Sequence, residues 1–156
     1  MTDPRNALTQ EDRQQMVDAT IRYCWAIDGG NWAELADVFD VDAVVEFGFM
    51  PAVQGLPAIE AVVKRALGSL DGSQHIVANH QIEASDDGIR SRCYFQAQHI
   101  RKGVEGGANY IIAGIYRDRW SAEGDAWRIV HRELEVLWTD GNPAVVGRLP
   151  RDPTES

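Results

Sequence analysis

The sequence lacks the local motifs of several large enzyme classes. It has no phosphate-cradling glycine loop, no G-x-S-x-G turn and no H-E-x-x-H pair. Its two cysteines, Cys24 and Cys93, form no metal-binding or redox pattern, which favours free thiols in a reducing cytoplasm. Any catalysis must therefore use side-chain acid–base chemistry or a cofactor that leaves no local motif.

Long apolar runs and excess positive charge are also missing. No apolar run approaches the roughly 20 residues that span a bilayer, and the polar segment 1–15 lacks the apolar stretch of a secretory signal. The 15 Lys and Arg residues are outnumbered by 24 Asp and Glu, so the formal net charge is −9. Such a charge repels nucleic acids and anionic membranes. We expect a cytoplasmic protein whose partners include neither.

The length and composition are those of one globular domain. With 156 residues and 44% hydrophobic content, the chain can bury a sizeable core. We expect a single domain over residues 1–156, with a core at about 8–138 and a C-terminal tail at 139–156. The tail contains three of the six prolines and is predicted to be extended, which would let it lie over a pocket mouth of its own or of a neighbouring subunit.

The first half of the chain predicts three helices and one strand. A helix begins after Thr9, with Asp12 in its first turn, and stops at Gly29-Gly30. Asn31 can cap a short second helix, whose buried side would be Trp32, Leu35 and Phe39. The third helix begins at Pro57 and ends near Gly68. The strand covers 42–49, with Val45, Phe47 and Phe49 on one face.

The second half predicts an antiparallel meander. Its β-branched and aromatic segments are separated by short polar turns and cover 74–84, 90–101, 109–121 and 126–138. Helices followed by strands indicate an α+β fold, with the helices packed on one face of a curved sheet. A hollow between the helices and the sheet would then be the natural site.

Asp28 lies where neither helix packing nor helix electrostatics favours a carboxylate. Val17, Ile21, Cys24 and Asp28 follow at helical spacing, which places the acid on the apolar face. The C-terminal end of a helix also disfavours negative charge. A frayed last turn in water would explain this position. A functional carboxylate would as well, because residues that break local rules often carry function.

Strand alternation places His75 and His99 differently. His75 groups with Val77 and Asn79, opposite the more apolar face of Ile76, Ala78, His80 and Ile82. A bulge, or a sheet buried on both faces, would be needed to bring His75 inside. By contrast, His99 closes an apolar face with Cys93, Phe95 and Ala97, which predicts that this face is concave. A structural histidine would fit there too.

Other polar residues have structural alternatives. Arg132 lies on the last strand and can bind a substrate anion or pair with an acid. Tyr23 and Tyr116 can donate a phenolic proton or satisfy a nearby carbonyl. His80 and His131 fit structural or exposed positions. With Phe47 and Phe95, these tyrosines and Arg132 are the predicted substrate-binding residues.

The sequence resembles the SnoaL-like branch of the nuclear transport factor 2-like superfamily over about residues 8–138. The segments that carry the resemblance are IRYCWAIDGGNWAELADVFDVDAVVEF, GLPAIEAVV, SQHIVANHQI and AGIYRDRWSAEGDAWRIVHRELEVLW. The resemblance implies a cone-shaped barrel in which a curved, mixed or antiparallel sheet packs on three N-terminal helices. Within the branch, the pattern is closest to scytalone dehydratase and hexachlorocyclohexane dehydrochlorinase.

Those enzymes are cofactor-independent lyases that use an aspartate at the end of the first helix and a histidine early in the sheet. Asp28 and His75 match these positions, and His99 matches a second histidine of the dehydratase. Ile27 and Phe47 stand where the dehydratase has two tyrosines that hold the leaving water. The resemblance therefore implies an Asp–His pair without those hydroxyl groups.

The implied function is a lyase or isomerase that needs no cofactor and no metal and acts on a small, largely apolar cyclic substrate. His75 would act as general base, Asp28 would hold its other ring nitrogen, and His99 would stabilise an enolate or protonate a leaving group. Two alternatives remain: a small-molecule binding protein without catalysis, and a small structural subunit of an aromatic-ring dioxygenase. The apolar residues on both faces of the last two strands also predict a homo-oligomer, either a dimer or a trimer.

Overall fold

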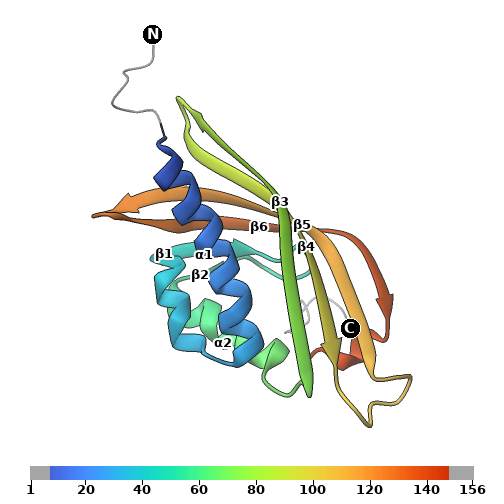
Figure 1. Ribbon diagram of the computed structural model, residues 1–156. Helices are drawn as coiled ribbons and strands as arrows, with labels where there is room; N and C mark the ends of the chain where they lie inside the picture. The colour runs from blue at the N-terminus through green and yellow to red at the C-terminus, as the bar shows by residue number, and fades with distance from the viewer. Residues whose placement is uncertain (1–7, 148–156) are drawn as a thin grey trace.

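The computed structural model describes residues 8–147 as a curved six-stranded sheet with its helices packed on one face (Figure 1). The predicted α+β cone is confirmed. The elements follow the order α1 (Gln10–Gly29), η2 (Trp32–Asp37), β1 (Phe39–Glu46), β2 (Val53–Gln54), α2 (Leu56–Leu67), β3 (Gly72–Ser85), β4 (Gly88–Ile100), β5 (Asn109–Glu123), β6 (Ala126–Gly141) and η3 (Pro143–Val145). Element η2 is a 3-10 helix rather than an α-helix.

Helix α1 begins and ends where the sequence predicts. Thr9 and Asp12 form a reciprocal capping box, in which each side chain bonds the backbone N–H of the other residue. Gly30 adopts φ 70°, and its N–H bonds the Ala26 carbonyl. This left-handed conformation is easiest for glycine, so Gly30 stops the helix just after Asp28.

The buried face of α1 differs from the predicted one. Ile21 is 39% exposed, so the predicted Val17–Ile21–Cys24–Asp28 stripe is wrong at its second member. Asp28 lies at the border of the true buried face and is only partly exposed. That face comprises Met16, Ala19, Thr20, Tyr23, Cys24, Ala26 and Ile27.

Two predicted boundaries in the first half need correction. Phe39 is the first residue of β1 rather than the end of a helix, and Phe49 lies beyond that strand with 52% of its surface exposed. Asn31 precedes η2, but its side chain makes no capping hydrogen bond. The third helix does begin with Pro57 in its first turn.

The sheet has the order β2-β1-β6-β5-β4-β3. Strands β3 to β6 form the predicted antiparallel meander. β1 joins this meander by pairing in parallel with β6, and the short strand β2 adds an antiparallel partner to β1. The mixed sheet thus brings the first strand of the chain beside the last one.

A bulge at Asn79 exchanges the two faces of β3. Asn79 has φ 60°, and the pairing with β4 shifts register between Ala78 and Gln81. Before the bulge Val77 packs against the core while Ile76 is 54% exposed. After the bulge Ile82 packs against the core. The simple alternation that placed Ile76 inside and His75 outside is therefore wrong, because the extra residue breaks the period of two.

Helix α1 runs along the free edge of β3 and is tied to it by polar contacts. Arg13 Nη1 donates to the Ile82 carbonyl at 2.8 Å, and Thr20 Oγ1 lies 2.8 Å from His80 Nε2. These contacts satisfy polar groups of an edge strand that has a neighbouring strand, β4, on one side. They hold the N-terminal and middle turns of α1 against the second half of β3.

The C-terminal segment folds back toward α2. β6 continues to Gly141, beyond the predicted end at residue 138, and η3 follows in the predicted tail. Val145 is fully buried, and Gly147 donates to the Ala66 carbonyl at 3.0 Å. Residues 148–156, the remainder of the predicted tail, lie outside the described residues. Between residues 8 and 147, no helix is long and apolar enough to cross a membrane.

Candidate active site

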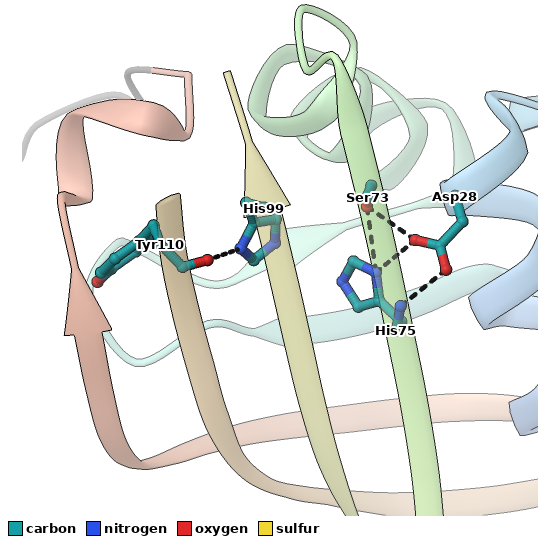
Figure 2. A network of polar contacts seen from close by, with 5 residues as sticks. All are labelled: Asp28, Ser73, His75, His99 and Tyr110. Atoms are coloured by element: carbon teal, nitrogen blue, oxygen red, sulfur yellow. Dashed lines mark hydrogen bonds and ion pairs between the residues drawn. The ribbon is translucent and has the colours of Figure 1, made fainter. Parts of the chain in front are cut away.

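Asp28 holds His75 through both its ring and its backbone. Asp28 Oδ1 lies 2.7 Å from His75 Nδ1, and Asp28 Oδ2 accepts the His75 backbone N–H at 2.7 Å. Ser73 Oγ also donates to Asp28 Oδ1 at 2.7 Å (Figure 2). The last turn of α1 is therefore joined to the start of β3 by one carboxylate with three donors.

These donors offset the unfavourable position of the acid at a helix C-terminus. Burial raises the pKa of Asp28, but the hydrogen bonds from the His75 ring, the His75 backbone and Ser73 outweigh it and lower the pKa below its usual value of 3.8. The carboxylate is thus ionised at neutral pH. It accepts the Nδ1–H of His75, so in the neutral form of that ring Nε2 has a free lone pair.

His99 is held in the same tautomer by a different acceptor. Its Nδ1 lies 3.1 Å from the carbonyl oxygen of Tyr110, on the neighbouring strand β5. A carbonyl oxygen only accepts, so Nδ1 carries the proton and Nε2 has a lone pair in the neutral ring. Burial, with a smaller effect of His75, lowers the pKa of His99 from 6.5 to about 4. His99 is therefore neutral at physiological pH.

The two imidazoles face each other across the start of β3 and the end of β4. Their ring centroids are 5.4 Å apart and their planes meet at 80°. In Figure 2 each Nδ1 points away from the other ring, toward Asp28 or Tyr110, and each second nitrogen points into the space between the rings. Both residues line the same cavity.

This cavity has a volume of about 100 Å³ and a mostly apolar wall. Its wall includes four of the predicted substrate-binding residues, Tyr23, Phe47, Phe95 and Tyr116, together with aliphatic side chains of α2. Pockets for drug-sized ligands have roughly 300–1,000 Å³, so the ligand admitted here is small. Asp28 does not line the cavity. It lies behind His75, beside an outer groove formed with Trp25 and Ile76.

Arg132 is the predicted substrate-binding residue that does not line the cavity. Its guanidinium forms a two-point ion pair with Asp118, at 2.7 Å and 2.8 Å, and both side chains are 1% exposed. It also lies 4.7 Å from the ring centre of Tyr23 and 4.1 Å from that of Tyr116. The structure thus shows the pairing alternative for Arg132, behind the tyrosines that line the cavity.

The remaining histidines and cysteines have structural surroundings. His80 contacts Thr20, as described above, and His131 Nε2 lies 2.8 Å from Glu46 Oε2 on the outer face. Both cysteines are free and buried, and burial raises the pKa of Cys24 to about 11 and that of Cys93 to about 12. Within residues 8–147, no three His, Cys, Asp or Glu side chains cluster as a metal site.

Sequence reasoning missed Ser73 and the carbonyl of Tyr110. Ser73 precedes His75 by two residues on the same strand, so alternation places both side chains on one face and could have found it. The Tyr110 carbonyl is invisible in the sequence, because it reaches His99 through the register of β4 and β5, in which His99 pairs with Tyr110.

The chain matches the model of the SnoaL-like domain over residues 9–133. It is 25% identical over 143 residues to the terrestric acid biosynthesis cluster protein E of Penicillium crustosum. The aligned region covers 88% of this chain and 90% of that protein. A candidate scytalone dehydratase of Novosphingobium aromaticivorans has a similar structure, with a TM-score of 0.76, 19% identity, and coverage of 88% of this chain and 91% of that one.

A hexachlorocyclohexane dehydrochlorinase of Novosphingobium barchaimii is also similar, with a TM-score of 0.74 and 14% identity over 90% of this chain and 96% of that one. At such identities the solved structures show a shared fold. The chain belongs to the SnoaL-like domain family, because the family model covers most of its length. Its fold is the cone that the sequence predicts.

Proposed function

We propose that the protein is a cofactor-independent lyase or isomerase that acts on a small, largely apolar cyclic substrate. The observation that carries this proposal is the 2.7 Å contact between Asp28 and the Nδ1 of His75, with His75 at the wall of an apolar cavity. A carboxylate that fixes the tautomer of a neutral imidazole prepares its other nitrogen to act as a general base.

In the proposed reaction His75 Nε2 accepts a proton from a C–H group next to a carbonyl or a leaving group. The electron pair of that bond forms a carbon–carbon double bond. In an elimination the leaving group departs with its bonding pair. In an isomerisation the imidazolium returns the proton to a second carbon. Asp28 touches no substrate atom in this scheme and acts as a positioning residue that stabilises the imidazolium.

Two similarities support this reaction class. The solved structures that share the cone include a dehydrochlorinase and a candidate dehydratase. The Penicillium relative is named for a biosynthesis cluster. The geometry adds a cavity that is small, apolar and in contact with both histidines. General acid–base catalysis of this kind supplies about 10²–10⁴-fold in rate.

Hydrogen–deuterium exchange tests the proposal without knowledge of the natural substrate. The protein would be incubated in D₂O with small cyclic ketones that also carry a hydroxyl group, such as 4-hydroxycyclohexanone, and exchange next to the carbonyl would be followed by NMR. We expect exchange above the buffer rate, lowered at least about 100-fold in His75→Gln. The control is His131→Gln, because His131 lies on the outer face against Glu46. Exchange that survives His75→Gln would contradict the assignment of the base.

We also propose that the chain forms a homo-oligomer in the cytoplasm. Support for association comes from large apolar side chains that remain exposed on the sheet, including Ile76, Tyr94, Leu137 and Trp138. Free buried thiols at Cys24 and Cys93 support a reducing compartment. Sedimentation equilibrium measures the order of the oligomer, and a monomer at micromolar concentration would contradict the first part.

A further inference from the structure

Both histidines present the same kind of polar atom, a ring Nε2, to the cavity. Asp28 holds the Nδ1–H of His75, and the Tyr110 carbonyl holds the Nδ1–H of His99. In the neutral rings both Nε2 atoms therefore carry lone pairs, and both point into the space between the rings (Figure 2). Moving the His99 proton to Nε2 would leave its Nδ1 lone pair facing the Tyr110 carbonyl oxygen. The arrangement thus favours two acceptors and no donor.

A cation that could attract an anionic ligand is missing from the cavity wall within residues 8–147. No Lys or Arg side chain lines it there. Arg132, which lies behind Tyr23 and Tyr116, is already paired with the Asp118 carboxylate. A bound carboxylate or phosphate would meet two lone pairs, with the ionised Asp28 behind one of them. Burying a charge without a partner is strongly unfavourable.

The remaining polar side chains on the wall are Tyr23 and Tyr116, and both rings pack tightly in the core. Tyr116 stacks on Phe95 with centroids 4.3 Å apart, and Tyr23 meets Tyr116 edge to face at 5.9 Å. Neutral phenols and imidazoles, with an apolar wall around them, suit an uncharged ring that brings its own proton donors. A ligand without such donors would leave buried lone pairs unsatisfied.

We propose that the site selects an uncharged, single-ring compound with two proton donors, one for each Nε2 atom. This inference rests on the proposed function insofar as the cavity is taken as the substrate site. In the reacting complex the donor at His75 is the polarised C–H whose proton is removed, and the donor at His99 is an O–H or N–H group. His99 is then a specificity-determining acceptor rather than a general acid at neutral pH.

Binding of simple ring compounds tests the inference independently of turnover. Resorcinol has two O–H donors, m-xylene has methyl groups of similar size in their place, and benzoate is an anion. Each would be titrated calorimetrically at pH 7.5 into the full chain, its His99→Leu variant and the control His131→Gln. We expect His99→Leu to weaken resorcinol about tenfold without weakening m-xylene. Benzoate should not bind measurably at concentrations that saturate resorcinol.

Nitrogen-15 NMR of the unsubstituted protein keeps the test decisive even if His99→Leu does not fold. Both histidines should show protonated Nδ1 and unprotonated Nε2, and both Nε2 resonances should move when resorcinol binds. A proton on either Nε2, equal binding of benzoate, or an absence of resorcinol binding would each overturn the inference. Selective binding without deuterium exchange would instead remove the proposed catalysis and leave the inference standing.

Discussion

Asp28 and His75 are joined at two points, since one carboxylate oxygen contacts the ring Nδ1 and the other accepts the backbone N–H of the same residue, each at 2.7 Å. The two contacts have different consequences. The ring contact orients the imidazole toward the cavity, whereas the backbone contact attaches α1 to the edge of β3. A single side chain therefore links the chemistry of the site to the packing of the helix.

Asp28→Asn should impair both functions of that carboxylate. An asparagine can accept with one atom only, so one of the two His75 contacts loses its acceptor. We expect a loss of stability of about 1–3 kcal/mol in urea denaturation, and a larger relative loss of deuterium exchange than of ligand binding. Asp18→Asn is a matched control on the same helix, because Asp18 contacts Gln14 at the exposed surface. Full exchange activity in Asp28→Asn would argue against the proposed pair.

Ser73→Ala should have a smaller effect of the same kind. The change removes one of the three donors to Asp28 while leaving both contacts with His75. We expect a loss of about 0.5–1.5 kcal/mol in stability and a lower exchange rate constant with unchanged ligand affinity. Ser73→Thr should restore the rate because it keeps the hydroxyl. An affinity loss equal to the rate loss would indicate that Ser73 contacts the ligand directly.

His99 should make the folded state sensitive to mild acid. Burial keeps its ring neutral down to about pH 4, whereas in the unfolded chain it binds a proton below about pH 6.5. The unfolded state thus binds more protons in this interval, and stability falls as the pH is lowered from about 6.5 to 4, by on the order of 3 kcal/mol. Chemical denaturation of the unsubstituted protein and His99→Gln across this interval measures the effect, and equal slopes would contradict it.

Asn79 should tolerate glycine but not a β-branched residue. At φ 60° an asparagine is accepted and a glycine is unstrained, whereas valine is strongly disfavoured. We expect Asn79→Gly to change stability by less than about 1 kcal/mol and Asn79→Val to lower it by about 1–3 kcal/mol. Deletion of Asn79 should also abolish deuterium exchange. Without the extra residue, the strand segment before or after position 79 must present its opposite face to the core. Thermal unfolding and the exchange assay provide these measurements.

Arg132 and Asp118 should behave as a coupled structural pair. Arg132→Met leaves the Asp118 carboxylate buried without its partner, which typically costs about 3–5 kcal/mol. Replacing both residues by leucine should recover most of that loss, since no buried charge remains. A double-mutant cycle in urea gives the coupling energy. A well-folded Arg132→Met protein that has lost only ligand affinity would instead support the predicted role in substrate binding.

Much of the fold could be predicted because its signals are local. The capping box at Thr9 and Asp12, the stop at Gly30 and the turns of the meander depend on residues a few positions apart. The parallel pairing of β1 with β6 could not be predicted in this way. It joins residues such as Val45 and Arg132, which are far apart in sequence and share no local pattern.

The sequence by itself determined the α+β order, the termini of α1 and α2, the apolar face that ends in His99, and the residue types available for acid–base chemistry. Resemblance to known lyases singled out His75, which strand alternation had placed outside. Only the tertiary structure decided which face of β3 points to the cavity and which tautomer His75 and His99 adopt. The bulge at Asn79 turns His75 inward, and Asp28 and the Tyr110 carbonyl fix the two ring protons. These features arise from contacts between strands and a helix, so their energies depend on residues that only folding brings together.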